Sequence, residues 1–115
     1  MSSFKDAFTN KQAVANLDSN SFEKMIGIKD SVLIDVRTIE ENVKISIPNS
    51  ILIDIHQPDF LARIDELDKT KTYLVYCHSG NRSYTACLYM QSMGFQNVFN
   101  LAHGISKYSG ALKKN

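Results

Sequence analysis

One cysteine stands where the sequence changes from a strand pattern to a helix pattern. The β-rich apolar run 72–76 leads directly into Cys77, and the polar residues 78–81 separate it from Arg82, which opens a helical stretch. In open α/β sheets, ligands bind at the carboxyl ends of the strands. Converging loop N–H groups and the dipole of the following helix favour an anion there, so we expect a lowered pKa for Cys77. The segment therefore predicts a nucleophilic thiolate in an anion-binding loop.

Two further residues of the loop suit that chemistry. Gly80 can adopt a backbone conformation that residues with a Cβ atom avoid. The guanidinium of Arg82, the loop's only permanent cation, can fork onto an oxyanion. A free cysteine is most often a small buried hydrophobe. The strand-end position of Cys77, with Gly80 and Arg82 after it, instead favours a functional thiol.

The second cysteine has a different setting. Cys87 lies beside Ala86 on the expected inner face of the helix after the loop, which favours core packing over a resolving role. Two cysteines do not form a disulfide framework, and no cluster of Cys or His in the sequence has the spacing of a zinc site. We therefore expect any special chemistry to come from Cys77, without a metal.

Strand patterns alternate with helical stretches along the chain, as in an α/β domain with a largely parallel sheet. The expected strands are 32–36, 51–53, 72–76 and 97–99, with an edge strand at 13–15. Helices are expected over 22–26 after a cap at Asp18 or Ser19, over 60–67, and from Arg82 to Gly94. The apolar residues expected to face the sheet from the last two helices are Phe60, Leu61, Ile64 and Leu67, then Ala86, Cys87, Tyr89, Met90 and Met93.

Length and composition fit one ordinary globular unit. The 115 residues suffice for a single domain spanning 1–115, with 1–12 peripheral to it, and 43% hydrophobic residues suffice for a core. A net charge of +1 argues against nucleic acid as the main partner. No apolar run approaches the roughly 20 residues of a membrane span, and residues 1–11 lack the apolar core of a signal peptide. We therefore expect a cytoplasmic protein with no membrane partner.

The segment 77–83, Cys-His-Ser-Gly-Asn-Arg-Ser, resembles the Cys-x-x-Gly-x-Arg-Ser active loop of rhodanese-like sulfurtransferases. Other signatures of that family occur in the same order at 33–41, 47–50, 94–98 and 101–105, so the resemblance spans roughly residues 14–108. Several spaced signatures are far more specific than one loop. Departures include Asn49 for a glycine of the turn after Pro48, and His103 for the first glycine of the closing pair.

The resemblance implies a single rhodanese-like α/β domain, with a twisted, mainly parallel five-stranded sheet flanked by helices on both faces. It also implies a sulfurtransferase in which Cys77 takes up sulfane sulfur as a persulfide, without metal or organic cofactor. The resemblance leaves the donor and acceptor open: it is compatible with a small donor such as thiosulfate, a polysulfide or glutathione persulfide, or with a protein persulfide as partner, and with a thiol or cyanide as acceptor. The substrate-binding residues implied by the loop are His78, Ser79, Gly80, Asn81, Arg82 and Ser83.

Residues outside the loop receive lesser roles. His103 is expected near the active loop, where an imidazole could narrow the pocket or control protonation. Asp35 and Arg37, in the first signature, are expected to form a structural ion pair or hydrogen bonds to neighbouring loops. Glu40 and Glu41 are interpreted as a solvated helix start.

Two other functions are compatible with these residues. The first is a rhodanese-like module that carries or senses persulfide, or binds a protein, with little turnover of small donors. The second is a phosphatase or arsenate reductase, since related folds use a cysteine and an arginine for that chemistry. In those enzymes five residues separate Cys from Arg, whereas here four do, and the shorter loop suits a sulfur atom better than a phosphoryl group. Sulfur transfer is therefore the favoured hypothesis.

Overall fold

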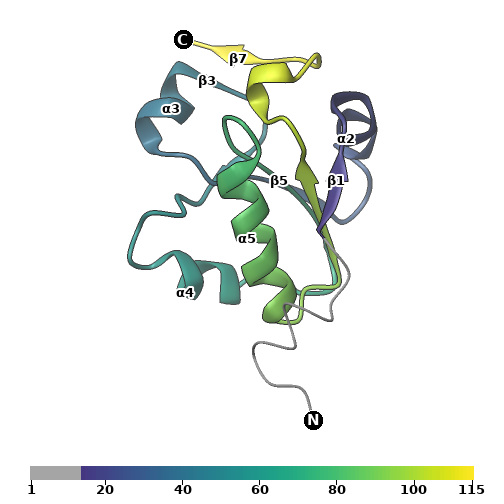
Figure 1. The fold of residues 1–115 in the computed structure, drawn as a ribbon, viewed down its shortest axis with the longest axis vertical. Helices are drawn as coiled ribbons and strands as arrows, with labels where there is room; N and C mark the ends of the chain where they lie inside the picture. The colour runs from purple at the N-terminus through teal and green to yellow at the C-terminus, as the bar shows by residue number, and fades with distance from the viewer. Residues whose placement is uncertain (1–13) are drawn as a thin grey trace.

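Five short strands form one parallel sheet in the computed structural model, which describes residues 14–115 (Figure 1). The strand order is β1-β6-β5-β2-β4, and every neighbouring pair is parallel. The strands are β1 (Ala15–Leu17), β2 (Ser31–Asp35), β4 (Ile51–Leu52), β5 (Thr72–Tyr76) and β6 (Asn97–Leu101). The central β5 lies between β6 and β2, so the loop that follows it emerges near the middle of the sheet edge.

Helices connect the strands and cover both faces of the sheet. They are α2 (Ser19–Met25), α3 (Ile39–Lys44), α4 (Phe60–Asp65), α5 (Asn81–Ser92) and the 3₁₀ helix η1 (Ile105–Lys107). Figure 1 shows α5 lying across the front of the sheet, with the β5–α5 loop at its upper end beside the C-terminal segment. The expected α/β fold with a five-stranded parallel sheet is therefore confirmed. Among the described residues, no helix is long and apolar enough to cross a membrane.

The side chains of β5 alternate between two hydrophobic clusters. Tyr73, Val75 and Cys77 belong to the cluster formed with α4 and α5, whereas Leu74 and Tyr76 belong to the cluster formed with α2 and η1. This alternation follows from the two-residue period of a strand. Because both faces are covered, β5 is apolar throughout, and Cys77 enters the loop from the side of the sheet that α5 covers.

Most element boundaries lie within two residues of those expected from the sequence. Asp18 is the cap of α2, since its Oδ1 accepts the backbone N–H of Ser21 at 2.8 Å. The edge strand falls at 15–17 rather than 13–15. Residue 13 and the peripheral segment 1–12 lie outside the described residues.

Two residues predicted to be buried are not. Leu61 is 49% exposed and Tyr89 is 37% exposed. Each helix turns only a narrow stripe toward the sheet, and the fully buried positions of α5 are already taken by neighbours such as Ala86 and Met90. Tyr89 lies at the margin of that stripe, where its ring is 6.5 Å from the ring of Phe60.

A second, two-stranded sheet was not predicted from the sequence. β3 (Ile45–Ser46) pairs antiparallel with β7 (Lys113–Lys114) near the C-terminus. Strands of two residues are too short to show an alternating pattern, and two adjacent lysines do not resemble a strand. The pairing closes the C-terminal segment over α3, close to the active-loop end of the sheet (Figure 1).

The turn before β4 needs a left-handed backbone at Asn49. Its φ is +69°, a left-handed value that glycine adopts without steric strain and that asparagine tolerates better than most other residues. The substitution of Asn49 for the glycine common in the resembling family therefore keeps the turn geometry.

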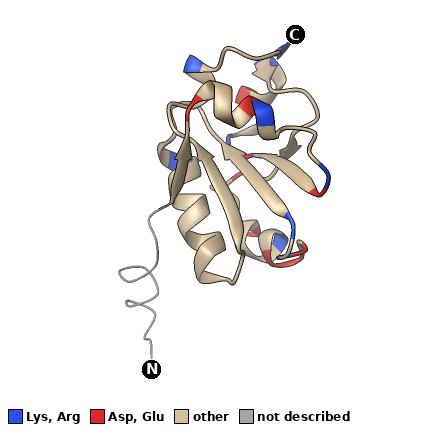
Figure 2. Ribbon diagram, turned by 90° about the vertical axis from the view of Figure 1, so that its right-hand side faces the viewer, with Lys and Arg blue, Asp and Glu red and all other residues tan. Residues whose placement is uncertain are grey.

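In the view of Figure 2, Lys, Arg, Asp and Glu are interspersed at the ends of the elements, and the strands carry little charge between their ends.

A buried ion pair ties β2 to the next two elements. Arg37 donates to both carboxylate oxygens of Asp35, from Nε at 2.9 Å and from Nη2 at 2.8 Å, and these side chains are 2% and 0% exposed. Arg37 also donates to the carbonyl oxygen of Ile45 at 2.6 Å, and Asn42 donates to Asp35 at 3.0 Å. The Arg37 guanidinium lies 5.5 Å from the centre of the Tyr76 ring. The pair therefore connects the end of β2 with α3 and β3.

We predict that Arg37→Met lowers the free energy of unfolding by about 3–5 kcal/mol, because it leaves the Asp35 carboxylate buried without its partner. The matched control is Lys69→Met, which breaks the exposed pair between Lys69 and Asp65 and should cost about 1 kcal/mol or less. Urea unfolding followed by circular dichroism measures both. Equal losses in the two variants would contradict a structural role for the buried pair.

Candidate active site

The sulfur of Cys77 lies in a cradle of hydrogen-bond donors. The backbone N–H of Gly80 donates to Cys77 Sγ at 3.1 Å, and the hydroxyl of Ser83 lies 3.3 Å from the same atom. Cys77 is 1% exposed and Ser83 is 0% exposed. Donors directed at one sulfur stabilise the charged thiolate more than the neutral thiol. The loop therefore contains the components of the predicted anion-binding site around a thiol.

Two opposing effects set the pKa of Cys77. Burial raises the pKa of the thiol, but hydrogen bonds from the Ser83 hydroxyl and from the backbone N–H groups of Ser83, Gly80 and Ser79 outweigh it. The net result is a pKa below that of a free cysteine. A lower pKa increases the thiolate fraction at neutral pH, and the thiolate is the nucleophilic form.

The second cysteine shows what burial does without donors. Cys87 is 0% exposed and packs in the core cluster with Ala86 and Met90. Burial raises the pKa of its thiol well above the ordinary value, and the nearby Cys77 adds to this. Cys87 is therefore an unreactive core residue in this structure, consistent with the packing role favoured from the sequence.

The active loop is locked against the turn that follows β6. At Gly80, where φ is +102°, a Cβ atom would overlap the carbonyl oxygen of Ala102. At Gly104, where φ is +67°, a Cβ atom would overlap the carbonyl of His78. Both positions therefore require glycine, for left-handed backbone and for close approach at once. The two segments are in backbone contact because neither glycine has a side chain.

Hydrogen bonds hold these two segments together. The N–H of Ile105 donates to the carbonyl of Cys77 at 2.9 Å, and the N–H of Ser106 donates to the carbonyl of His78 at 3.1 Å. The carbonyls of Cys77 and His78 are thus paired with the start of η1 and are unavailable to ligands. The N–H groups of Ser79, Gly80 and Ser83 are the ones directed at the sulfur.

Asn100 supports the loop from beneath. This residue of β6 is 1% exposed, and its Nδ2 donates to the carbonyl of Gly80 at 3.2 Å and to Oδ1 of Asn16 at 2.9 Å. Its own Oδ1 is buried and has no hydrogen-bond partner among residues 14–115. An unpaired buried acceptor costs free energy, so the contact of Asn100 with the loop is maintained against a local penalty.

Arg82 does not project freely into the site. Its Nη1 and Nη2 donate to Oε1 and Oε2 of Glu41, each at 2.8 Å, in a two-pronged ion pair. The hydrogen bonds from Arg82 are the main reason that the pKa of Glu41 falls to about 2. Glu41 lies at the start of α3, as interpreted from the sequence, but its side chain is only 31% exposed and is paired with Arg82 rather than simply solvated. Glu40, its neighbour, is exposed as expected.

The other polar residues predicted for the site lie at the surface. The side chains of His78, Ser79 and Asn81 are exposed around the cradle. His103 is also exposed, on the turn that is locked to the loop, and its carbonyl accepts a hydrogen bond from Ser106 at 3.0 Å. Within residues 14–115, the His, Cys, Asp and Glu side chains form no group that could hold a metal ion.

One hollow borders the active loop through Arg82. It has a volume of about 320 Å³ and is lined by Ile55, His56, Arg82, Thr85 and Tyr89. Its arginine, threonine and tyrosine share one side of α5, and the other two residues belong to the segment between β4 and α4. The hollow therefore extends from the first turn of α5 along the helix.

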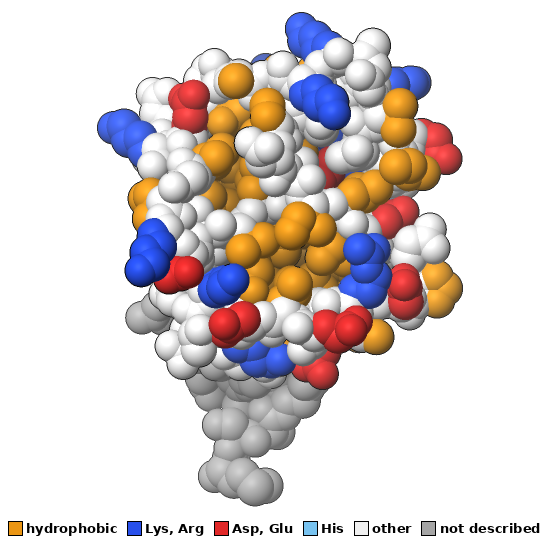
Figure 3. Space-filling model, turned by 180° about the vertical axis from the view of Figure 1, so that it is seen from behind, with side chains coloured by type: hydrophobic (Ala, Val, Ile, Leu, Met, Phe, Trp, Pro, Cys, Tyr) orange, Lys and Arg blue, Asp and Glu red, His pale blue; other side chains and the backbone are white. Residues whose placement is uncertain are grey.

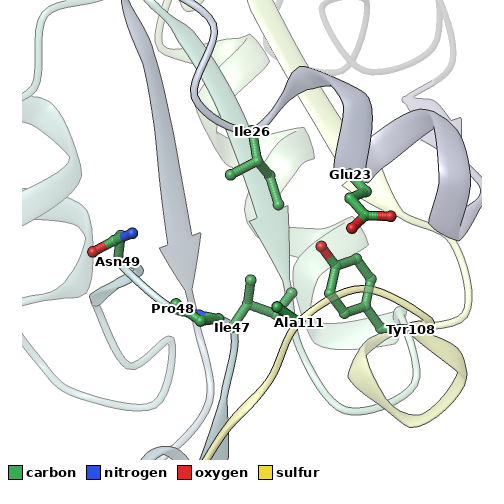
Figure 4. Close-up of a pocket in the computed structure, with 7 residues that line it drawn as sticks. All are labelled: Glu23, Ile26, Ile47, Pro48, Asn49, Tyr108 and Ala111. Atoms are coloured by element: carbon green, nitrogen blue, oxygen red, sulfur yellow. The ribbon is translucent and has the colours of Figure 1, made fainter.

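Other hollows lie away from the nucleophile. A hollow of about 270 Å³ between Ile26 at the end of α2, the turn at Pro48 and Tyr108 contains no residue of the 77–83 loop in its lining (Figure 4). On the face opposite α5, hydrophobic side chains gather between charged ones (Figure 3), and Leu33 and Leu74 line a smaller hollow of about 160 Å³. These hollows have no direct connection to the chemistry of Cys77.

Sequence reasoning missed two residues of the site, Glu41 and Asn100. The spacing of Thr38 and Glu41 is a capping-box signal that predicts the helix start, and this box is present, but it says nothing about Arg82, forty-one residues later. Asn100 interrupts an apolar strand with a polar residue, which is an available hint that a buried group needs a hydrogen bond. Its partner on the loop becomes evident only in three dimensions.

We predict that Gly104→Ala destabilises the protein far more than Gly27→Ala. Gly27 also has a positive φ, +85°, but a Cβ atom there meets nothing within 4 Å. Gly27→Ala should therefore cost only the conformational penalty of about 1–2 kcal/mol, whereas Gly104→Ala adds a steric cost of about 1–3 kcal/mol against the backbone of His78. Urea unfolding measures the difference, and equal losses would argue against the close backbone contact.

We predict that Ser83→Ala shifts the pH dependence of Cys77 alkylation to higher pH. Removal of the hydroxyl donor destabilises the thiolate, so the pKa rises and the thiolate forms later in a titration. Iodoacetamide labelling at a series of pH values, followed by mass spectrometry, measures the midpoint. Ser92→Ala, a matched change at the far end of α5, should leave the midpoint unchanged. An unchanged midpoint in Ser83→Ala would contradict the role of this hydrogen bond.

Known proteins resemble this chain in both sequence and fold. The family model for the rhodanese-like domain matches residues 18–111 of this chain. A sulfurtransferase from Allochromatium vinosum is 34% identical over 93 residues, which cover 80% of this chain and 85% of that protein. The putative sulfur carrier protein YrkF from Bacillus subtilis is 29% identical over 102 residues, 88% of this chain, and this chain spans 54% of its length.

A solved structure agrees in fold. The rhodanese-like domain protein from Staphylococcus aureus superimposes with a TM-score of 0.76 at 22% identity, over 89% of this chain and 99% of that one. The relatives support sulfur transfer as the general chemistry of this chain, and the resemblance stated from its motifs is confirmed. The chain belongs to the family of rhodanese-like domains.

Proposed function

We propose that this protein is a rhodanese-type sulfurtransferase that moves sulfane sulfur through a persulfide on Cys77. The observation that carries the proposal is the cradle in which the N–H of Gly80 and the hydroxyl of Ser83 lie within 3.3 Å of Cys77 Sγ. This arrangement lowers the pKa of a buried thiol, which would otherwise be raised. A thiol with a moderately lowered pKa is suited to attack and then to leave.

In the first half-reaction, the Cys77 thiolate attacks the outer sulfur of the donor. With thiosulfate, the new bond joins Cys77 Sγ to that sulfur, the old sulfur–sulfur bond breaks, and its electron pair leaves on sulfite. The product is the Cys77 persulfide, and no external oxidant or reductant is needed. The backbone N–H groups of residues 78–82 are assigned to hold the negative charge of the donor and of the outer sulfur.

In the second half-reaction, a thiophilic acceptor attacks the outer sulfur of the persulfide. Cyanide would leave as thiocyanate, and a thiol would leave as a new persulfide, while the electron pair of the broken bond returns to Cys77 as thiolate. Ser83 stays hydrogen-bonded to Sγ and stabilises this leaving thiolate. His78, Ser79, Asn81 and His103 are assigned to the rim that the donor and acceptor approach.

A second function is favoured by one observation. Arg82, the permanent cation of the loop, is paired with Glu41 and is not free to attract a small anion. A domain with such a site could receive and carry persulfide for a protein partner with little turnover of small donors.

Because all of this chemistry requires Cys77 as a free thiol, we place the protein in a reducing compartment, the cytoplasm.

The test is intact-mass analysis after exposure to thiosulfate or glutathione persulfide, followed by cyanide. We predict a gain of one sulfur, about 32 Da, in the unmodified protein and in Cys87→Ala, complete loss of this adduct in Cys77→Ser, and its discharge by cyanide. Steady-state thiocyanate formation then separates an enzyme from a carrier, since a carrier loads but turns over slowly. Failure of every donor to load Cys77 would refute the proposed function.

A further inference from the structure

The pairing of Glu41 with Arg82 changes the charge that a donor meets. Both terminal nitrogens of the guanidinium are engaged at 2.8 Å with the two carboxylate oxygens. Glu41 is itself fixed from the other side, because Oε1 accepts from the backbone N–H and hydroxyl of Thr38, each at 3.2 Å. The carboxylate therefore holds the guanidinium from an anchored position at the start of α3.

Glu41 removes the net positive charge that Arg82 would bring to the loop. The Glu41 hydrogen bonds raise the pKa of Arg82, and the charge of Cys77 adds to this. Glu41, with a pKa of about 2, stays ionised wherever the protein is folded and Cys77 titrates. Glu41 and Arg82 cancel each other, so the Cys77 thiolate keeps its full negative charge with no net positive charge beside it. A dianionic donor with both charges on the reacting group is therefore repelled, and only loop N–H groups oppose the repulsion.

The hollow beside this ion pair has room for an organic group. Its volume of about 320 Å³ lies within the range of small-molecule sites, and Arg82 is shared between it and the loop. The aliphatic Ile55 and the partly exposed ring of Tyr89 offer apolar contact, while Thr85 and His56 offer polar contact. Thiosulfate would leave this hollow empty, whereas the carbon-bearing half of an organic persulfide could occupy it.

We propose that Glu41 makes the site selective for organic persulfides over thiosulfate, with the organic group bound in the hollow lined by Ile55, Thr85 and Tyr89. This inference rests on the proposed sulfur transfer and names its donor class. The reacting form of the donor is the protonated persulfide, whose reacting group is uncharged: the sulfane sulfur carries a hydrogen and is bonded to a carbon-bearing sulfur. Glu41 is a positioning residue, because it acts through Arg82.

The corresponding step balances without a co-reactant. The Cys77 thiolate attacks the terminal, hydrogen-bearing sulfur of the persulfide, and the bond between the two donor sulfurs breaks. The electron pair leaves on the organic thiolate, and the Cys77 persulfide forms with its hydrogen. The persulfide group enters uncharged, and the negative charge of the Cys77 thiolate leaves on the organic thiolate, so no second charge accumulates next to Glu41.

The decisive comparison uses Glu41→Gln and Glu40→Gln. Glutamine keeps the size of Glu41 and can retain the capping box through its amide oxygen. It carries no charge, so the positive charge of Arg82 is no longer neutralised. The measurement is the second-order rate constant for loading Cys77 from thiosulfate and from glutathione persulfide. We expect Glu41→Gln to raise the ratio of the thiosulfate constant to the persulfide constant about five- to tenfold. Glu40→Gln removes an equal charge from an exposed neighbour and should leave this ratio unchanged.

A second variant tests the hollow. Thr85 is exposed on α5, so Thr85→Phe fills the hollow without entering the core, and we expect it to slow loading from glutathione persulfide while leaving thiosulfate unaffected. The inference is overturned if the unmodified protein prefers thiosulfate, if Glu41→Gln changes both donors equally, or if Thr85→Phe affects neither. Those results leave the proposed function intact, since Cys77 still loads. Only absence of loading from both donors would remove the function itself.

Discussion

Backbone contact between the active loop and the turn after β6 is the constraint on which the site depends. Gly80 and Gly104 allow the two segments to approach closer than any side chain permits, and the N–H groups of Ile105 and Ser106 then pair with the carbonyls of Cys77 and His78. With these carbonyls turned toward η1, the loop directs N–H groups at the sulfur. The polarity of the site therefore follows from a packing requirement imposed by the segment after the neighbouring strand β6.

The two cysteines show how finely burial and hydrogen bonding compete. Both are essentially inaccessible, and burial alone raises the pKa of each. Cys77 differs because a helix begins beside it, bringing Ser83 and free N–H groups within reach. Cys87, inside the same helix, has its surrounding backbone groups already paired along the helix. Reactivity therefore depends on position relative to the start of α5 rather than on exposure.

Local patterns predicted the sheet, most of the helices and the position of Cys77 in the loop between β5 and α5, because strand alternation, capping residues and the Cys77 loop are encoded within short windows. The same windows failed where two distant segments meet. In the sequence, Glu41 is an ordinary acidic residue in a first helical turn, and Asn100 is a polar residue within a mostly apolar strand. The two-residue β3 and β7 are formed by pairing alone, with no propensity of their own. Each failure concerns a partner that is remote in sequence and therefore invisible to periodicity.

The segment from Asp35 to Glu41 controls both arginines at the carboxyl edge of the sheet. Asp35 binds Arg37 in a pair that is almost fully buried, and this pair fixes the direction in which the chain leaves β2. Thr38 then caps α3 and anchors Glu41, which reaches Arg82 on α5. A structural pair in the interior thus positions a partly exposed pair beside the Cys77 loop. Because the outer pair is partly exposed, its replacement should cost less stability than that of the buried pair, which leaves the charge of the site free to vary while the fold and the thiolate cradle are kept.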